Sequence, residues 1–174
     1  MARFKTTCNG TIIVPYKAEA HLKTHPSVRK VLTEAIAMLR LPTDKSFLAI
    51  EVAMGRVVGL AECVKAPVIK VNQETFFAQR KERQGVSRIT QESKGEESSK
   101  LAIFAFASRE DARVYVLATA FIGSINHKEP WDRNIKSQEE YQKSINFWSS
   151  HALVYDPKVM EKVFKSTWEK ALLL

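Results

Sequence analysis

The runs Leu101-Ala102-Ile103-Phe104-Ala105-Phe106-Ala107 and Val114-Tyr115-Val116-Leu117-Ala118-Thr119-Ala120-Phe121 decide the fold. Both are apolar at almost every position, whereas a strand with one face in water alternates apolar and polar residues. The segment between them, Ser108-Arg109-Glu110-Asp111, is typical of a turn. We therefore predict two central strands of an antiparallel sheet that is covered on both faces.

Shorter β-branched and aromatic runs come before these two strands. They predict further strands of an antiparallel meander at residues 47–52, 56–64, 75–80 and 86–90, and residues 11–14 predict a separate short strand upstream. Residues 91–100 are rich in Ser and Glu and predict a mobile loop.

Helical patterns occur towards both ends of the chain. From Pro26, apolar residues recur at three- and four-residue spacing and predict a helix that ends near Leu41-Pro42. Residues 137–148 predict a second helix with a capping box at its start. A final helix is predicted from Asp156-Pro157 onwards. The fold class is therefore α+β: a bent antiparallel β-meander of about five or six strands with N-terminal and C-terminal helices packed on it. We expect one domain over residues 1–174.

The composition excludes several classes of protein. The chain has 174 residues, 45% of them hydrophobic, which is typical of a globular protein. It lacks the roughly 20 consecutive apolar residues of a membrane-spanning helix, and Met1 to Lys5 begin no apolar secretory segment. We expect a cytoplasmic protein with no membrane partner. Cys8 and Cys63 have no CxxC spacing and are expected to be thiols.

Positive charge is concentrated in the first half of the sequence. The net charge is +8, and residues 1–90 hold 15 Lys plus Arg against 7 Asp plus Glu. Clustered cations attract polyanions, because binding to phosphates releases condensed counterions. RNA or another polyanion is therefore the expected partner, although a solvated charged turn would leave the same pattern in residues 79–88. The sequence does not predict an oligomeric state.

No strong catalytic motif is present. The chain has no phosphate-binding loop, GxSxG, HExxH, GxGxxG or paired CxxC. His21 and His25 have the spacing of a two-histidine metal half-site, but Pro26 interrupts the helix and no third ligand is evident. We expect neither a metal nor a cofactor.

Three residues are candidates for acid–base chemistry. His21 or His25 would act as a general acid or base, because histidine titrates near neutral pH. Thr119 is the polar residue in its apolar run and would supply an orienting hydroxyl.

Five residues are candidates for ligand binding. Arg80, Arg83 and Arg88 lie at the ends of two predicted strands joined by a short turn, so their guanidinium groups would converge on a phosphate. Arg56 lies between small residues that allow close approach of a ligand. Trp131, in a long connection, would stack on an exposed base; the alternative, which the sequence favours, is that it clamps this connection onto the sheet.

Four segments, Gly55 to Gly59, Tyr115 to Gly123, Glu129 to Asp132 and Phe147 to Val154, resemble those of an uncharacterised bacterial protein family of similar length. This resemblance covers most of residues 21–154 and implies no activity.

The histidine-bearing N-terminal helix and the following meander also resemble ribonuclease toxins of the barnase, EndoU, colicin and RelE type. That resemblance implies RNA cleavage through a 2′,3′-cyclic phosphate without a metal. His25 or His21 would be the acid–base group, Arg56, Arg80 and Arg88 the phosphate clamp, and Thr119 the orienting hydroxyl.

The sequence thus favours a protein that binds a phosphate-bearing or nucleic-acid ligand through a basic surface. A metal-independent ribonuclease and a non-catalytic protein-interaction module are the alternatives, so the chain is not assigned as an enzyme or a non-enzyme.

Overall fold

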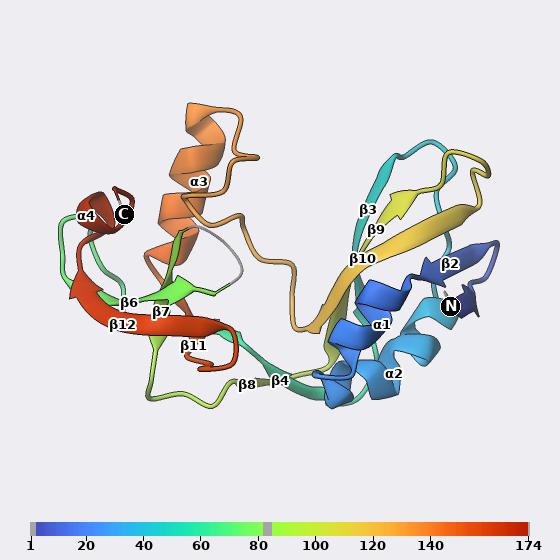
Figure 1. The fold of residues 1–174 in the computed structure, drawn as a ribbon, viewed down its shortest axis with the longest axis horizontal. Helices are drawn as coiled ribbons and strands as arrows, with labels where there is room; N and C mark the ends of the chain where they lie inside the picture. Colours follow the sequence, from blue (N-terminus) through green and yellow to red (C-terminus); the bar gives the residue numbers. More distant parts are fainter. Residues whose placement is uncertain (1–2, 82–84, 174) are drawn as a thin grey trace. The chain divides into compact units, whose positions relative to one another are not determined.

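The computed structural model describes residues 3–81 and 85–173 (Figure 1). The chain forms two compact units. Unit 1 comprises Met1–Ala61 and Glu97–Ile125, and unit 2 comprises Glu62–Glu96 and Asn126–Leu174. The chain thus passes between the units three times, where the sequence predicted one domain.

Unit 1 is built on a five-stranded sheet. Its strand order is β1 (Arg3–Thr6), β2 (Thr11–Val14), β10 (Val114–Ile122), β9 (Lys100–Ala107) and β3 (Phe47–Ala53). The β2–β10 pair is parallel and the other neighbours are antiparallel. The predicted meander is therefore not confirmed here, because the chain leaves β2, crosses through two helices and returns at β3 on the far edge.

The two crossover helices cover one face of this sheet. They are α1 (Tyr16–Leu22) and α2 (Pro26–Ala37), and α2 has Pro26 in its first turn, where a missing N–H costs little. The apolar stripe of α2 packs with the inward-facing residues of the strands in one buried cluster, which includes Ile12, Val31, Leu32, Ala35, Ile36, Leu48, Leu101, Ile103, Tyr115 and Leu117. This confirms that N-terminal helices pack on the sheet.

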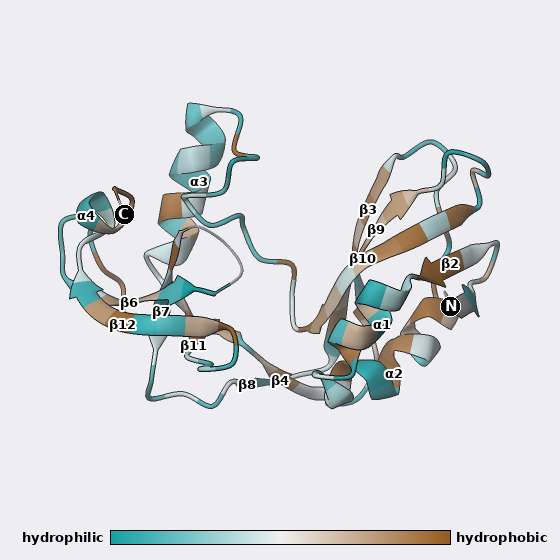
Figure 2. Cartoon of the chain, in the orientation of Figure 1, coloured by the Kyte–Doolittle hydropathy of each residue, from teal (hydrophilic) through white to brown (hydrophobic). Residues whose placement is uncertain are grey.

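The opposite face of the unit 1 sheet is open in the structure. In β9 and β10, Phe106, Ala118 and Thr119 are exposed. The prediction that both strands are covered on both sides was therefore wrong for this face. Figure 2 shows hydrophobic colouring along much of β9 and β10.

Unit 2 contains a second five-stranded sheet. Its order is β12 (Met160–Ser166), β6 (Thr75–Arg80), β7 (Val86–Thr90), β11 (His151–Val154) and β5 (Cys63–Lys65), with β7 and β11 parallel. Its core includes Phe77, Trp148 and Trp168, which join the sheet to α3 (Gln138–Trp148) and α4 (Trp168–Ala171). A separate two-stranded sheet pairs β4 (Gly59–Ala61) with β8 (Glu96–Ser98).

Three predicted elements differ from the structure. The strand predicted at 56–64 is split into β4 and β5, and the loop predicted at 91–100 contains β8. The final helix predicted from Asp156 is instead β12 followed by the short α4. Its apolar residues are compatible with either period over this length, and pairing with β6 decides between them.

The helix predicted at residues 137–148 is confirmed. It begins as expected, because the Ser137 hydroxyl accepts a hydrogen bond from the Glu140 N–H at 3.1 Å. None of the helices in the described parts of the chain is long and apolar enough to cross a membrane.

Candidate functional site

The open face of the unit 1 sheet carries four phenylalanines, Phe47, Phe104, Phe106 and Phe121, which we call the phenylalanine row. Ring centroids are 5.0 Å apart for Phe47 and Phe106, 6.1 Å for Phe47 and Phe104, and 5.6 Å for Phe104 and Phe121. Phe47 is 43% exposed and Phe106 is 55% exposed. The row is thus a continuous aromatic surface accessible from solvent.

Strand register explains why the rings meet. Phe47 of β3 lies directly opposite Phe106 of β9, so their side chains are cross-strand neighbours. Phe104 faces Ala49 on one side, and Phe121 of β10 faces Ala102. Because these alanines occupy little space, the rings contact one another rather than larger side chains.

Strand β10 contains an irregularity beside the row. Leu117 is paired with Ala105 and Thr119 with Phe104, so Ala118 is an extra residue without a partner in the ladder. Ala118 and Thr119 are both exposed. The bulge therefore places the predicted site residue Thr119 on the open face, next to Phe104.

One end of the row borders a shallow depression of about 340 Å³. It is lined by residues 43–46, which immediately precede Phe47, and by residues 107–112, which immediately follow Phe106. The lining includes Lys45 and Arg109 but also three carboxylates, so its charge does not favour an anion.

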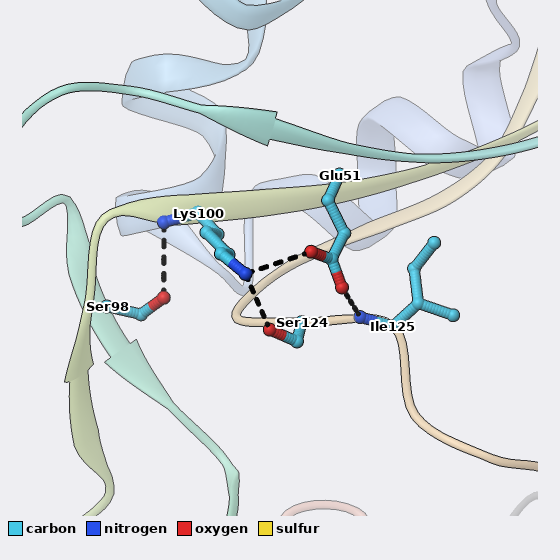
Figure 3. A network of polar contacts seen from close by, with 5 residues as sticks. All are labelled: Glu51, Ser98, Lys100, Ser124 and Ile125. Carbon is cyan, nitrogen blue, oxygen red and sulfur yellow. Dashed lines mark hydrogen bonds and ion pairs between the residues drawn. The ribbon is translucent and has the colours of Figure 1, made fainter.

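Near the other end, Glu51 and Lys100 form an ion pair at 3.1 Å (Figure 3). Glu51 also accepts a hydrogen bond from the Ile125 N–H at 2.7 Å, and Lys100 contacts the Ser124 hydroxyl at 3.5 Å. The Ile125 hydrogen bond, with help from Lys100, holds the pKa of Glu51 below its usual value. This network neutralises the two charged side chains of the open face and fixes residues 124 and 125 to the sheet.

Unit 1 has the larger net positive charge. Its segments contain 12 Lys plus Arg against 7 Asp plus Glu, compared with 15 against 12 in unit 2. Exposed cations of α1, α2 and the link between them include Lys17, Lys23 and Lys30, and no carboxylate in the described residues pairs with these three. The excess charge that the sequence placed in residues 1–90 is therefore divided between the units.

The structure brings His21 and His25 together. Their ring centroids are 4.8 Å apart, and His25 is the N-cap residue of α2. Arg56 lies in the same unit, but its guanidinium forms two hydrogen bonds with the Glu34 carboxylate, at 2.7 and 2.6 Å. Arg56 is therefore engaged by a helix residue rather than by the histidines.

The remaining predicted residues belong to unit 2, and those that the structure describes lie in different surroundings. Arg88 is only 2% exposed, and its guanidinium donates to backbone carbonyl oxygens. Arg80 is half-buried on β6, and Arg83 lies outside the described residues. The half-buried indole of Trp131 lies against Gly85, where an added Cβ would come within 2.6 Å of the ring. Trp131 therefore packs on Gly85, just before β7.

The cysteines and the acidic residues form no metal site in the described residues, where no group of three or more His, Cys, Asp or Glu side chains has a suitable arrangement. Cys8 and Cys63 are free thiols. Burial, with the nearby charges of Glu129 and Glu96, raises the pKa of Cys63 to about 12, which keeps it protonated and unreactive.

Sequence reasoning missed the phenylalanine row. The signal was present, because aromatic residues recur at alternate positions of a strand run, at Phe104 and Phe106. An apolar run of this kind predicts a strand that is covered on both faces, so the aromatic alternation does not stand out. No protein-family model, curated protein or solved structure matches this chain. The resemblances drawn from the sequence remain predictions.

Proposed function

We propose that the protein binds single-stranded nucleic acid on the open face of the unit 1 sheet. The observation that carries this proposal is the phenylalanine row on a sheet whose other face is covered by helices. Unpaired bases stack on aromatic side chains of such sheets, and stacking is worth about 1 to 3 kcal/mol per base. A duplex keeps its bases stacked on one another and offers no free base to the rings.

The charge of unit 1 supports a nucleic acid over an apolar protein partner. Glu51, near one end of the row, is paired with Lys100, which offsets its charge, and the carboxylates of the depression lie beyond the other end. The net positive charge of unit 1, which includes exposed lysines on its helix-covered side, attracts a polyanion to the unit as a whole at moderate salt. A protein partner or a second copy of the chain would need no such charge.

The test is fluorescence anisotropy with a labelled mixed-sequence RNA, the matching single-stranded DNA and the duplex. We expect tighter binding of the single strands than of the duplex, and a logarithm of affinity that falls linearly with the logarithm of salt concentration. The double change Phe47→Ala with Phe106→Ala should weaken single-strand binding by at least about tenfold, because two stacking platforms are lost.

Phe76→Ala is the matched control. Phe76 is 43% exposed, as is Phe47, but it lies on β6 of unit 2. It should leave binding unchanged. Equal affinity for duplex and single strand, or a double variant that binds as well as the wild type, would overturn the proposal. So would sedimentation showing that the chain self-associates through the row and binds no nucleic acid.

A metal-independent ribonuclease is the second candidate function, favoured by the contact between His21 and His25. Two adjacent imidazoles can act as general acid and general base if one is neutral and the other protonated. The same RNA should then be cleaved in the presence of a chelator, and His25→Ala should abolish cleavage. Intact RNA after prolonged incubation would remove this candidate and leave the binding proposal standing.

A further inference from the structure

We infer that Thr119 selects the base that stacks on Phe104. The inference rests on the proposed function and adds base preference to it. Stacking on phenylalanine tolerates every base, because each base has a π-face. Preference therefore requires a polar group beside the ring that contacts the edge of the base.

The bulge in β10 supplies such a group. Because Ala118 is an extra residue, Thr119 is brought opposite Phe104, and both Ala118 and Thr119 are exposed. Directly opposed side chains in antiparallel strands have Cβ atoms about 5 Å apart. That spacing places the Thr119 hydroxyl next to the edge of a base lying on the Phe104 ring.

Thr119 is also available for this role. Among the described residues, no protein group forms a hydrogen bond with its hydroxyl, whereas Glu51 and Lys100 on the same face are bound to each other. A hydroxyl without a protein partner can donate one hydrogen bond and accept another, so it can bind a base edge that presents a hydrogen-bond acceptor or donor beside it. The ring of Phe121, 5.6 Å from that of Phe104, extends the aromatic surface on the same strand as Thr119.

A bulge without function is a cost to the sheet. It interrupts the ladder between β9 and β10, two inner strands of the unit 1 sheet, where regular pairing would be more stable. Bulges of this kind commonly redirect a side chain next to a binding site. Here the redirected side chain is that of Thr119, whose hydroxyl lies beside the phenylalanine row.

The experiment compares anisotropy titrations of labelled oligo-A, oligo-C and oligo-U with the full chain and its variants. The wild type should prefer one homopolymer by about threefold to tenfold, the effect of one hydrogen bond. Thr119→Val, which keeps the shape but removes the hydroxyl, should lower affinity for the preferred homopolymer to that of the others. Thr119→Ser should retain the preference. Thr11→Val, a hydroxyl removed from β2 on the same sheet, should change nothing.

The outcomes separate the two proposals. If the wild type binds none of the homopolymers, the proposed function fails. If it binds them equally, or if Thr119→Val keeps the preference, the proposed function stands and the role of Thr119 is refuted. Circular dichroism and the unchanged affinity of Thr119→Val for the least preferred homopolymer confirm that the variant is folded.

Discussion

Replacing Arg88 tests how unit 2 is held together. The Arg88 guanidinium donates hydrogen bonds to the carbonyl oxygens of Pro67 at 2.6 Å, Ser149 at 2.8 Å and Trp148 at 3.0 Å, with a longer contact of 3.4 Å to His151. The acceptors at 148 and 149 are the last carbonyls of α3, where a cation also interacts favourably with the helix dipole. Burial lowers the pKa of Arg88 from its usual value.

The cost of losing Arg88 follows from these contacts. The acceptors belong to the backbone, so a substitution cannot remove them together with the donor. Each buried carbonyl left without a partner costs about 1 kcal/mol or more, so three short hydrogen bonds give about 3 kcal/mol for Arg88→Met, which preserves most of the volume. Arg88→Ala should cost about 2 kcal/mol more, since the packed methylenes are also lost. These changes are large against a typical stability of about 5 to 15 kcal/mol.

The assay is urea unfolding followed by tryptophan fluorescence and by circular dichroism. All three tryptophans, at positions 131, 148 and 168, belong to unit 2, so fluorescence reports on that unit, whereas circular dichroism reports on both. The fluorescence midpoint should fall by about 1 to 3 M, given a slope of about 1 to 3 kcal/mol per M. Arg80→Ala, the same kind of change on the neighbouring β6, is the control and should shift it little.

Two results would refute this reasoning. If Arg88→Met were as stable as the wild type, relief of the buried charge would offset the lost hydrogen bonds. If the fluorescence and circular dichroism transitions of the variants shifted together, units 1 and 2 would unfold as one domain, as the sequence predicts.

Three further predictions concern titratable groups. Burial, and secondarily Asp44, raises the pKa of Tyr115. Unit 1 should therefore lose stability as the pH rises above the pKa of an unfolded tyrosine. Tyr115→Phe should remove this loss, as measured by urea midpoints across pH. Because the pKa of Glu51 is lowered by folding, its contribution to stability is full above the unfolded value and is lost as the pH falls through the folded one. Glu51→Gln should therefore flatten the acid limb of the stability profile; an unchanged limb would contradict the network in Figure 3. A thiol reagent should modify exposed Cys8 quickly and Cys63 only at the rate of unfolding, as counted by mass spectrometry; equal rates would contradict the high pKa of Cys63.

The local patterns of the sequence were sufficient to predict many of the helices and strands. The helix that begins at Pro26, the capped helix after Ser137 and the strands at 75–80 and 86–90 lie where predicted. Each carries its own signal, a proline in the first turn, a capping box or a β-branched run bounded by turn residues. The segment from 156 to 172 carried no such unique signal, and pairing with β6 made it a strand.

The residues of the candidate site were likewise predicted only in part from the sequence. The sequence by itself determined that Thr119 is the polar residue of an apolar strand and that the chain is basic. The tertiary structure decided which face of the apolar strands has no cover, because α1 and α2 pack on one side of the unit 1 sheet. It also decided that Arg88 is buried and that Arg56 pairs with Glu34. Burial and pairing depend on residues far apart in the chain, so no local pattern reports them. The phenylalanine row exists only once β3, β9 and β10 are in register.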